Sequence, residues 1–369
     1  MTARPANAVD FWRGFALATI YVNHIPGIFL ERYSFRHYSL SDAAELFVFL
    51  AGVSLRYVCN SLAREPLSAA VYRLAGRALT IYFAQLVITS LAIAMLAGAA
   101  KTLNQPYILQ WTNASAVFDD PIDAHIGLAL LRYQLGFFDI LPLYVVLMAA
   151  GPTMAIIDRY APRALLPLSF ALYVYTLVTG LNLHTWPVEG EWYFSPFAWQ
   201  FIFVLGFVLS GPRGWSSWSP RVKRSLFWLA GAQVVLGAGL ALAGVAPDPA
   251  SLPSPKLFFV FDKTYLSPAR LLHALALACF FIPAFKPIQG LAPRLASYLA
   301  MLGRNSLNVF CAASLLSLLG QIVRYAFSGR IEIDVVMIVV GWSSMGLVAW
   351  LSEWRKRLAV ARAAREAAT

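Results

Sequence analysis

The chain has 369 residues, of which 59% are hydrophobic and only 13% are charged, and its mean hydropathy is +0.64. A soluble domain has about a quarter of its residues charged, so this composition excludes an ordinary water-soluble protein and indicates a polytopic membrane protein. The formal charge of +11 does not indicate a nucleic-acid-binding protein, because the basic residues lie in short loops between apolar segments. The cysteines Cys59, Cys279 and Cys311 are isolated and lack ligand spacing, so we expect neither disulfides nor a metal site.

Ten apolar segments predict an all-α membrane helical bundle that forms one integral-membrane domain over residues 1–369. When alternate loops are assigned to opposite sides, one side receives Arg4, most basic loop residues and the C-terminal segment EWRKRLAVARAAR. Basic loops favour the cytoplasm, so we expect both termini to be cytoplasmic. The expected spans are residues 11–30, 43–61, 74–98, 136–157, 164–181, 196–211, 226–245, 268–285, 301–321 and 333–352.

The first expected span, within DFWRGFALATIYVNHIPGIFL, carries ionisable residues in an apolar segment. Arg13 and His24 are eleven positions apart, so on one helix they differ by about 20° around the axis and about 16 Å along it. Taken singly, Arg13 can be explained by snorkelling to cytoplasmic phosphates, and His24 by a hydrogen bond between helices. Their shared face favours a functional role.

Polar residues recur at one depth in the outer half of the predicted bundle. SLSDAAELFV places two carboxylates three residues apart on one side of a helix, and GFFDILPLYV, SPFAWQFIFVLG and SPARLLHALALA add polar groups near the outer ends of three further spans. Unsatisfied polar groups are costly in hydrocarbon, so the sequence predicts one shared polar cavity; the alternative is a set of unrelated residues that snorkel outwards. The residues expected at this level, besides His24, are Asp42, Glu45, Asp139, Trp199, Gln200, Arg270 and His273.

A second polar group is expected nearer the cytoplasm. Arg73 and Arg77 are four residues apart in YRLAGRALTIYF and share a helix face with each other, and Asn305 lies in LGRNSLNVF. Together with Arg13, these residues can be explained as topology determinants. Arginine also binds phosphate bidentately, so the same cluster would suit a phosphorylated carrier such as coenzyme A. The sequence leaves both interpretations open.

The expected outer loops combine aromatic residues with acids, in NQPYILQWTNASAVFDDPIDAHIG and HTWPVEGEWYFSP. A plain interfacial belt of Trp and Tyr is one explanation. Carbohydrate binding is the other, because sugar rings stack on aromatic faces and sugar hydroxyls donate to carboxylates.

Six segments, in chain order, resemble the OpgC proteins within the integral-membrane acyltransferase family 3: DFWRG…NHIP, SDAAELFVFLAG, DILPLYVVLM, SPFAWQFIFVLG, SPARLLHALALA and LGRNSLNVF. This resemblance implies a multi-pass protein of the bacterial inner membrane that succinylates a periplasmic glucan. It implies that an acyl-CoA, with succinyl-CoA as the expected donor, is a co-substrate, and that Arg13 and His24 are the shared functional residues. It assigns no role to Asp42, Glu45, Asp139, Arg270 or His273, whose selection rests on depth and helix face alone.

The resulting hypothesis is an O-acyltransferase with no permanently bound cofactor and no metal ion. Acyl-CoA would bind with its phosphates near Arg13, Arg73 and Arg77. Arg270, or His273 when protonated, would stabilise the developing oxyanion or hold the distal carboxylate of a succinyl donor.

The predicted base is a neutral His24, oriented by a carboxylate such as Asp42 or Glu45. It would take the proton of a glucosyl hydroxyl as that hydroxyl attacks the thioester. The alternatives are His273 as the base, and a His24 that carries the acyl group itself.

A function of a different class also fits the composition, namely a glucan or lipid-linked sugar transporter with the buried histidines and carboxylates as a proton relay. Many secondary transporters show two related halves, and no such internal correspondence is visible here, which favours acyl transfer. A purely structural membrane subunit is the least favoured reading, because buried charge on several helices is costly. The sequence does not identify the acceptor glucan, the position modified or the oligomeric state.

Overall fold

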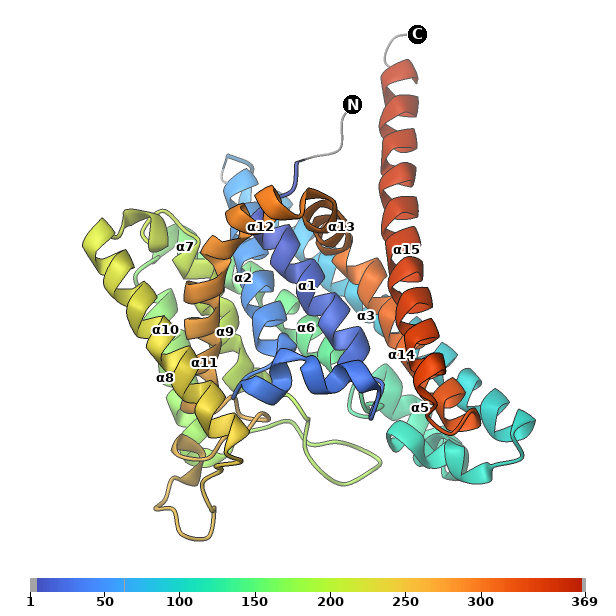
Figure 1. The fold of residues 1–369 in the computed structure, drawn as a ribbon. Coiled ribbons are helices and arrows are strands. Elements are labelled where there is room, and N and C mark those ends of the chain that lie inside the picture. Colours follow the sequence, from blue (N-terminus) through green and yellow to red (C-terminus); the bar gives the residue numbers. More distant parts are fainter. Residues whose placement is uncertain (1–4, 63, 367–369) are drawn as a thin grey trace. The chain divides into compact units, whose positions relative to one another are not determined.

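The computed structural model describes residues 5–62 and 64–366, and it confirms the all-α fold class (Figure 1). Over these ranges there is no regular strand, and the one extended pairing is an isolated bridge between His184 and Glu191. Arg4 lies outside the described residues. The chain forms two compact units. The first comprises the described parts of Met1–Ser34 and Phe281–Thr369, and the second comprises those of Phe35–Phe280.

Seven helical segments of the described chain are long and apolar enough to cross a membrane. Three further predicted spans correspond to shorter helices, namely α1 (Ala8–Asn23), α8 (Leu165–Thr179) and α9 (Pro196–Leu209). The protein is therefore a multi-pass membrane protein, whereas the count of ten spans and the cytoplasmic termini stay predictions. The seven segments are α2 (Ala43–Ser61), α3 (Leu67–Thr102), α6 with α7 (Ile140–Ala149 and Gly151–Tyr160), α10 (Pro220–Leu242), α11 with α12 (Pro268–Phe281 and Phe285–Leu291), α14 (Ser306–Ala326) and α15 (Ile331–Glu366).

In the first unit, α1 packs along α13 (Pro293–Arg304) and also contacts α14 (Figure 1). Small residues allow the two backbones of α1 and α13 to touch. A Cβ added to Gly14 would lie 1.8 Å from the carbonyl oxygen of Leu299, and one added to Gly303 would lie 1.8 Å from that of Asp10. Close crossings through glycine are typical of helix packing in membranes, where van der Waals contact replaces the hydrophobic effect.

The first helix ends at Asn23, seven residues before the predicted end of the first span at residue 30. Pro26 has no amide hydrogen to continue the helix, and Gly27 has φ +77°, a conformation that suits glycine. His24 is consequently the C-cap residue of the helix that carries Arg13, and the short 3₁₀ helix η1 (Phe29–Tyr33) follows the turn.

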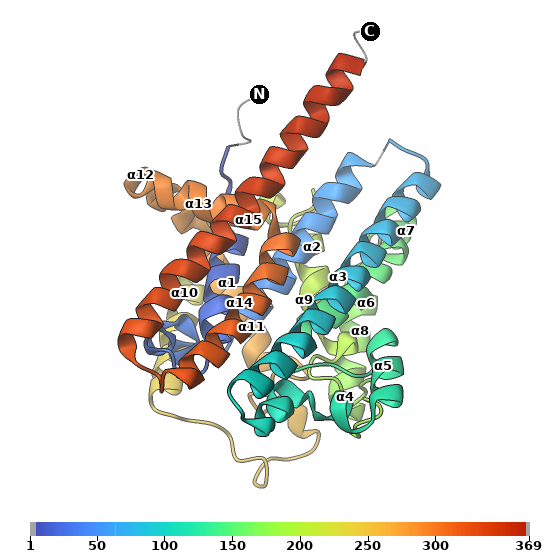
Figure 2. The same ribbon diagram turned by 90° about the vertical axis from the view of Figure 1, so that its right-hand side faces the viewer.

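In the second unit, α2 packs on α9, which also contacts α8 and α6. A Cβ at Gly52 of α2 or Gly206 of α9 would lie within 2.1 Å of a carbonyl oxygen of the facing helix. The long helix α3 lies along α6 and α7 (Figure 2), and α10 contacts η2 (Phe35–Tyr38). The rings of Phe227 and Phe280 stack at a centroid distance of 4.9 Å and join α10 to α11.

The predicted outer connection of residues 99–135 is largely helical. The helix α3 extends to Thr102, and the connection continues through η3 (Pro106–Asn113), α4 (Ser115–Asp119) and α5 (Pro121–Ala129). The predicted span 301–321 is interrupted at Asn305, which separates α13 from α14. Shorter 3₁₀ helices are η4 (Trp215–Ser217), η5 (Lys256–Phe258) and η6 (Ile282–Ala284).

Candidate active site

Four charged side chains form an ion-pair network at the start of α2. Asp42 caps this helix by accepting from the amide of Ala44, and Glu45 accepts from the amide of Asp42 at 2.9 Å, which completes a capping box. Arg270 of α11 donates to Glu45 Oε1 through Nε at 2.9 Å and Nη2 at 2.6 Å. Lys263 donates to Asp42 Oδ2 at 2.6 Å, and Arg270 Nη2 lies 3.7 Å from the same oxygen. We call Asp42, Glu45, Lys263 and Arg270 the ion-pair network.

The ion-pair network is almost closed to solvent. Glu45 has no exposed surface, and the side chain of Arg270 is 12% exposed. Lys263 is the most accessible member, with 25% of its side chain exposed. Burial lowers the pKa of Lys263, but the carboxylates of Asp42 and Glu45 raise it by more, so its pKa lies above the ordinary value. The ammonium group of Lys263 is therefore charged at neutral pH.

Trp199, one of the predicted site residues, lies beside this network and hydrogen-bonds to the backbone of Lys263 and Thr264. Its indole Nε1 donates to the carbonyl oxygens of Lys263 and Thr264 at 3.0 and 3.2 Å. Tyr173 of α8 donates to the carbonyl of Leu266 at 2.7 Å. Since Trp199 is fully buried, these bonds fix the loop before α11.

Trp199→Phe is expected to destabilise the second unit by about 1–3 kcal/mol, because it removes the two bonds from the buried indole, although the carbonyls of Lys263 and Thr264 keep their backbone donors. The measurement is the apparent melting temperature of the detergent-solubilised protein, which is monitored by size-exclusion chromatography. Trp228→Phe is the matched control, because Trp228 is 68% exposed on α10. Equal melting temperatures for the two variants would contradict the anchoring role of Trp199.

Asp139, the third predicted carboxylate, belongs to the same neighbourhood. It is the N-cap residue of α6 and lies within electrostatic range of Lys263 and Asp42. Gln85 of α3 donates through Nε2 to the carbonyl of the preceding residue, Phe138, at 3.0 Å. A side chain of the neighbouring helix α3 thus fixes the backbone next to Asp139 and holds Asp139 beside the ion-pair network.

His273 lies one helical turn after Arg270 and is fully buried. Its Nδ1 is 3.0 Å from Oε1 of Gln233 on α10. An amide oxygen only accepts hydrogen bonds, so Nδ1 carries the hydrogen in this contact, and in a neutral ring Nε2 is then the acceptor. Among the described residues, Nε2 has no hydrogen-bond partner. The structure thus places a second histidine with an available acceptor nitrogen in the helix that carries Arg270.

Gln200, also predicted for the cavity, joins two helices. Ser169 of α8 donates to its Oε1 at 2.5 Å, and its Nε2 donates back to the Ser169 carbonyl at 2.9 Å. Both ends of this amide are thus engaged in packing between α8 and α9.

His24 lies in the first unit, in a turn that α14 and α15 hold in place. Gln321 of α14 donates through Nε2 to the His24 carbonyl at 2.7 Å. Arg324, one turn later, donates to the carbonyl of Pro26 at 3.3 Å and to the buried Asp334 of α15 at 3.0 Å. The backbone of His24 is therefore fixed by side chains from other helices, and the imidazole itself is half-buried.

The predicted cytoplasmic residues are divided between the two units. Arg13 is half-buried on α1, and Asn305 accepts from Lys356 Nζ at 3.0 Å through Oδ1. Arg73 and Arg77 are exposed on the first half of α3, in the second unit. Within residues 5–62 and 64–366, no group of three or more His, Cys, Asp or Glu side chains is arranged to hold a metal ion.

A family model described as OpgC protein matches residues 6–357, nearly the whole chain. No curated protein matches the chain, and no solved structure does. The matched range contains the ion-pair network, His273 and the His24 turn.

Proposed function

The chain belongs to the OpgC family, whose members are membrane acyltransferases for periplasmic glucans, and from this we propose that it transfers a succinyl group from cytoplasmic succinyl-CoA to glucan hydroxyls. The observation that carries the proposal is the family match over residues 6–357. We place the enzyme in the bacterial inner membrane, with the phosphates of the donor near Arg13 of the first unit.

In the proposed reaction, His24 acts as the general base. Its neutral imidazole takes the proton of a glucosyl hydroxyl while the hydroxyl oxygen attacks the thioester carbonyl. The new C–O bond replaces the C–S bond, and the proton passes from the imidazolium to the departing thiolate of coenzyme A. General-base assistance is worth roughly 10²- to 10⁴-fold in rate. The fixed backbone of the His24 turn supports this role, because a catalytic base has to be held in one geometry.

Gln321→Leu is expected to lower kcat about two- to tenfold with little change in KM. The substitution removes the hydrogen bond to the His24 carbonyl but leaves the residue proposed to bind the phosphates of acyl-CoA unchanged. The measurement is steady-state succinyl transfer at matched amounts of folded protein. A raised KM with an unchanged kcat would contradict a positioning role for Gln321.

We propose that the ion-pair network of the second unit binds an anionic or hydroxyl group of a substrate. Lys263 supports this best, because an ammonium has three N–H donors and Asp42 occupies one of them. The side chain of Arg270 is less exposed and already makes two bonds to Glu45. His273 and Asp139 would line the same region.

The acceptor sugar is proposed to stack on aromatic residues next to Lys263. The Lys263 ammonium lies 5.6 Å from the ring centroid of Tyr193, which is 48% exposed. Nearby, Tyr265 donates to the carboxylate of Glu191 at 2.6 Å. An exposed ring next to a cation and a carboxylate supports carbohydrate as the ligand class over a plain interfacial belt.

The test is mass spectrometry of periplasmic glucans from a deletion strain that carries either the wild-type gene or an empty vector. We expect glucans to stay periplasmic in both strains and to lose succinyl groups in the strain with the empty vector. If the glucans of the wild-type strain carry acetyl groups in place of succinyl groups, the donor is acetyl-CoA and not succinyl-CoA. Glucan that disappears from the periplasm and accumulates in the cytoplasm would instead identify a transporter.

A further inference from the structure

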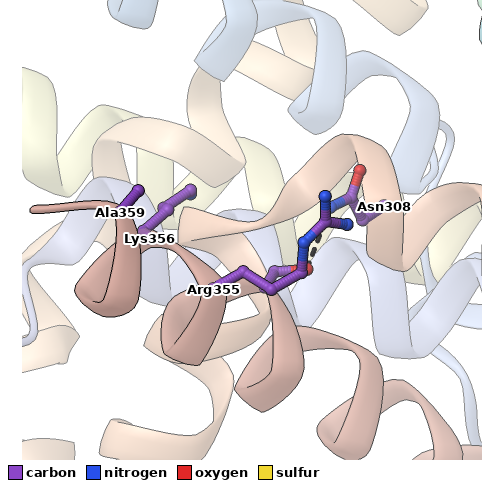
Figure 3. Close-up of a pocket in the computed structure, with 5 residues that line it drawn as sticks. Asn308, Arg355, Lys356 and Ala359 are labelled. Atoms are coloured by element: carbon purple, nitrogen blue, oxygen red, sulfur yellow. Dashed lines mark hydrogen bonds between the residues drawn. The ribbon is translucent and has the colours of Figure 1, made fainter. Parts of the chain in front are cut away.

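An open surface cavity of about 360 Å³ lies between α14 and α15 in the first unit (Figure 3). Its lining residues are Asn308, Ser352, Arg355, Lys356 and Ala359. Asn308 donates to the Ser352 hydroxyl at 2.9 Å and joins the two helices at this point. The volume falls within the range of about 300–1,000 Å³ that is typical of small-molecule sites.

The cavity is cationic. Among its described lining residues, two carry positive charge and none carries a carboxylate. The nearest acid in sequence, Glu353, is engaged by Arg304 at 2.8 Å and by Arg357 at 3.7 Å. Its charge is therefore balanced by residues outside the lining. Figure 3 shows the guanidinium of Arg355 reaching towards Asn308.

The position of the cavity along α15 corresponds to the membrane surface. Trp350 and Trp354, which flank the lining residue Ser352 on the same helix, are stacked at a centroid distance of 6.4 Å and are 48% and 46% exposed. Exposed tryptophans at the end of a spanning helix mark the interface with water. The basic segment WRKR begins at Trp354, and tryptophans followed by basic residues are the pattern expected at the level of lipid phosphates.

We propose that this cavity is a phosphate-binding site, with Arg355 binding two phosphate oxygens through its guanidinium and Lys356 adding a point charge. The phosphate belongs either to the headgroup of an anionic lipid or to the nucleotide part of the acyl donor. The tryptophan pair favours the lipid. As a lipid site it stands independently of the transfer reaction proposed above, whereas the acyl-donor source rests on that proposed function.

The test compares the wild type with the double variant Arg355→Gln/Lys356→Gln, purified in detergent. Native mass spectrometry follows titrations with phosphatidylglycerol, phosphatidylcholine and adenosine 3′,5′-bisphosphate. The control is Arg221→Gln/Arg224→Gln, which removes the same charge from exposed positions at the start of α10. Each cation removed from the site is expected to weaken binding about fivefold.

We expect the double variant to lose phosphatidylglycerol binding while the control keeps it, with phosphatidylcholine bound weakly throughout. Loss of adenosine 3′,5′-bisphosphate binding instead would support the site and assign its phosphate to the acyl donor. Equal affinities of wild type, double variant and control for both anionic probes would overturn the proposal.

Discussion

Replacing His24 with alanine is expected to lower the rate of succinyl transfer by roughly 10²- to 10⁴-fold, because the attacking hydroxyl loses its general base. The protein should remain folded. His24 contributes its backbone carbonyl to the bond from Gln321, and alanine keeps that carbonyl. The measurement is the initial rate of glucan succinylation at equal amounts of monodisperse protein.

The control for His24→Ala is His125→Ala, the same chemical change at an exposed histidine of α5. It is expected to leave the rate unchanged. If His24→Ala keeps the wild-type rate while His273→Ala abolishes transfer, the base is His273 and the proposed role of His24 is wrong. An acyl group trapped on His24 in the wild type would favour the covalent alternative.

The second large effect concerns stability. Arg270→Gln is expected to lower the free energy of unfolding by about 3–5 kcal/mol, because it leaves the fully buried Glu45 without its cation. The double variant Glu45→Gln/Arg270→Gln should recover much of this loss. The glutamine at position 45 can still accept from the Asp42 amide and keep the helix capped.

The measurement for this pair is a double-mutant cycle from unfolding curves of the detergent-solubilised protein. Arg77→Gln is the control, because Arg77 is exposed on α3 and should tolerate the change. Additive effects of the two single variants would contradict a direct interaction between Glu45 and Arg270 in solution.

Local sequence patterns predicted a good part of the fold. The second span, residues 43–61, was predicted from its apolar run and coincides with α2, whose start the structure shows to be fixed by a capping box at Asp42 and Glu45. The same two carboxylates and Arg270 were predicted at one depth, and they meet in one network. The agreement of the predicted second span with α2 comes from a rule that follows from the thickness of the bilayer.

Features that depend on tertiary packing could not be predicted from the sequence. Lys263 was not among the predicted site residues, because no local pattern links it to Asp42, which lies far away in the chain. The bonds from Gln321 to the His24 turn and from Gln200 to Ser169 join segments far apart in the chain. No periodicity encodes such pairings. The sequence did contain a signal for the early end of α1 at Asn23, because Pro26 and Gly27 lie inside the predicted span 11–30 and disfavour a helix there.

The most direct test of the central claim is transfer by purified enzyme in proteoliposomes, with isotopically labelled succinyl-CoA outside and glucan enclosed. Orientation is controlled by protease access to the C-terminal tail. The proposed function predicts labelled succinyl esters on the enclosed glucan with wild type and almost none with His24→Ala. Glucan that crosses the bilayer unlabelled, at the same rate with both proteins, would contradict an acyltransferase.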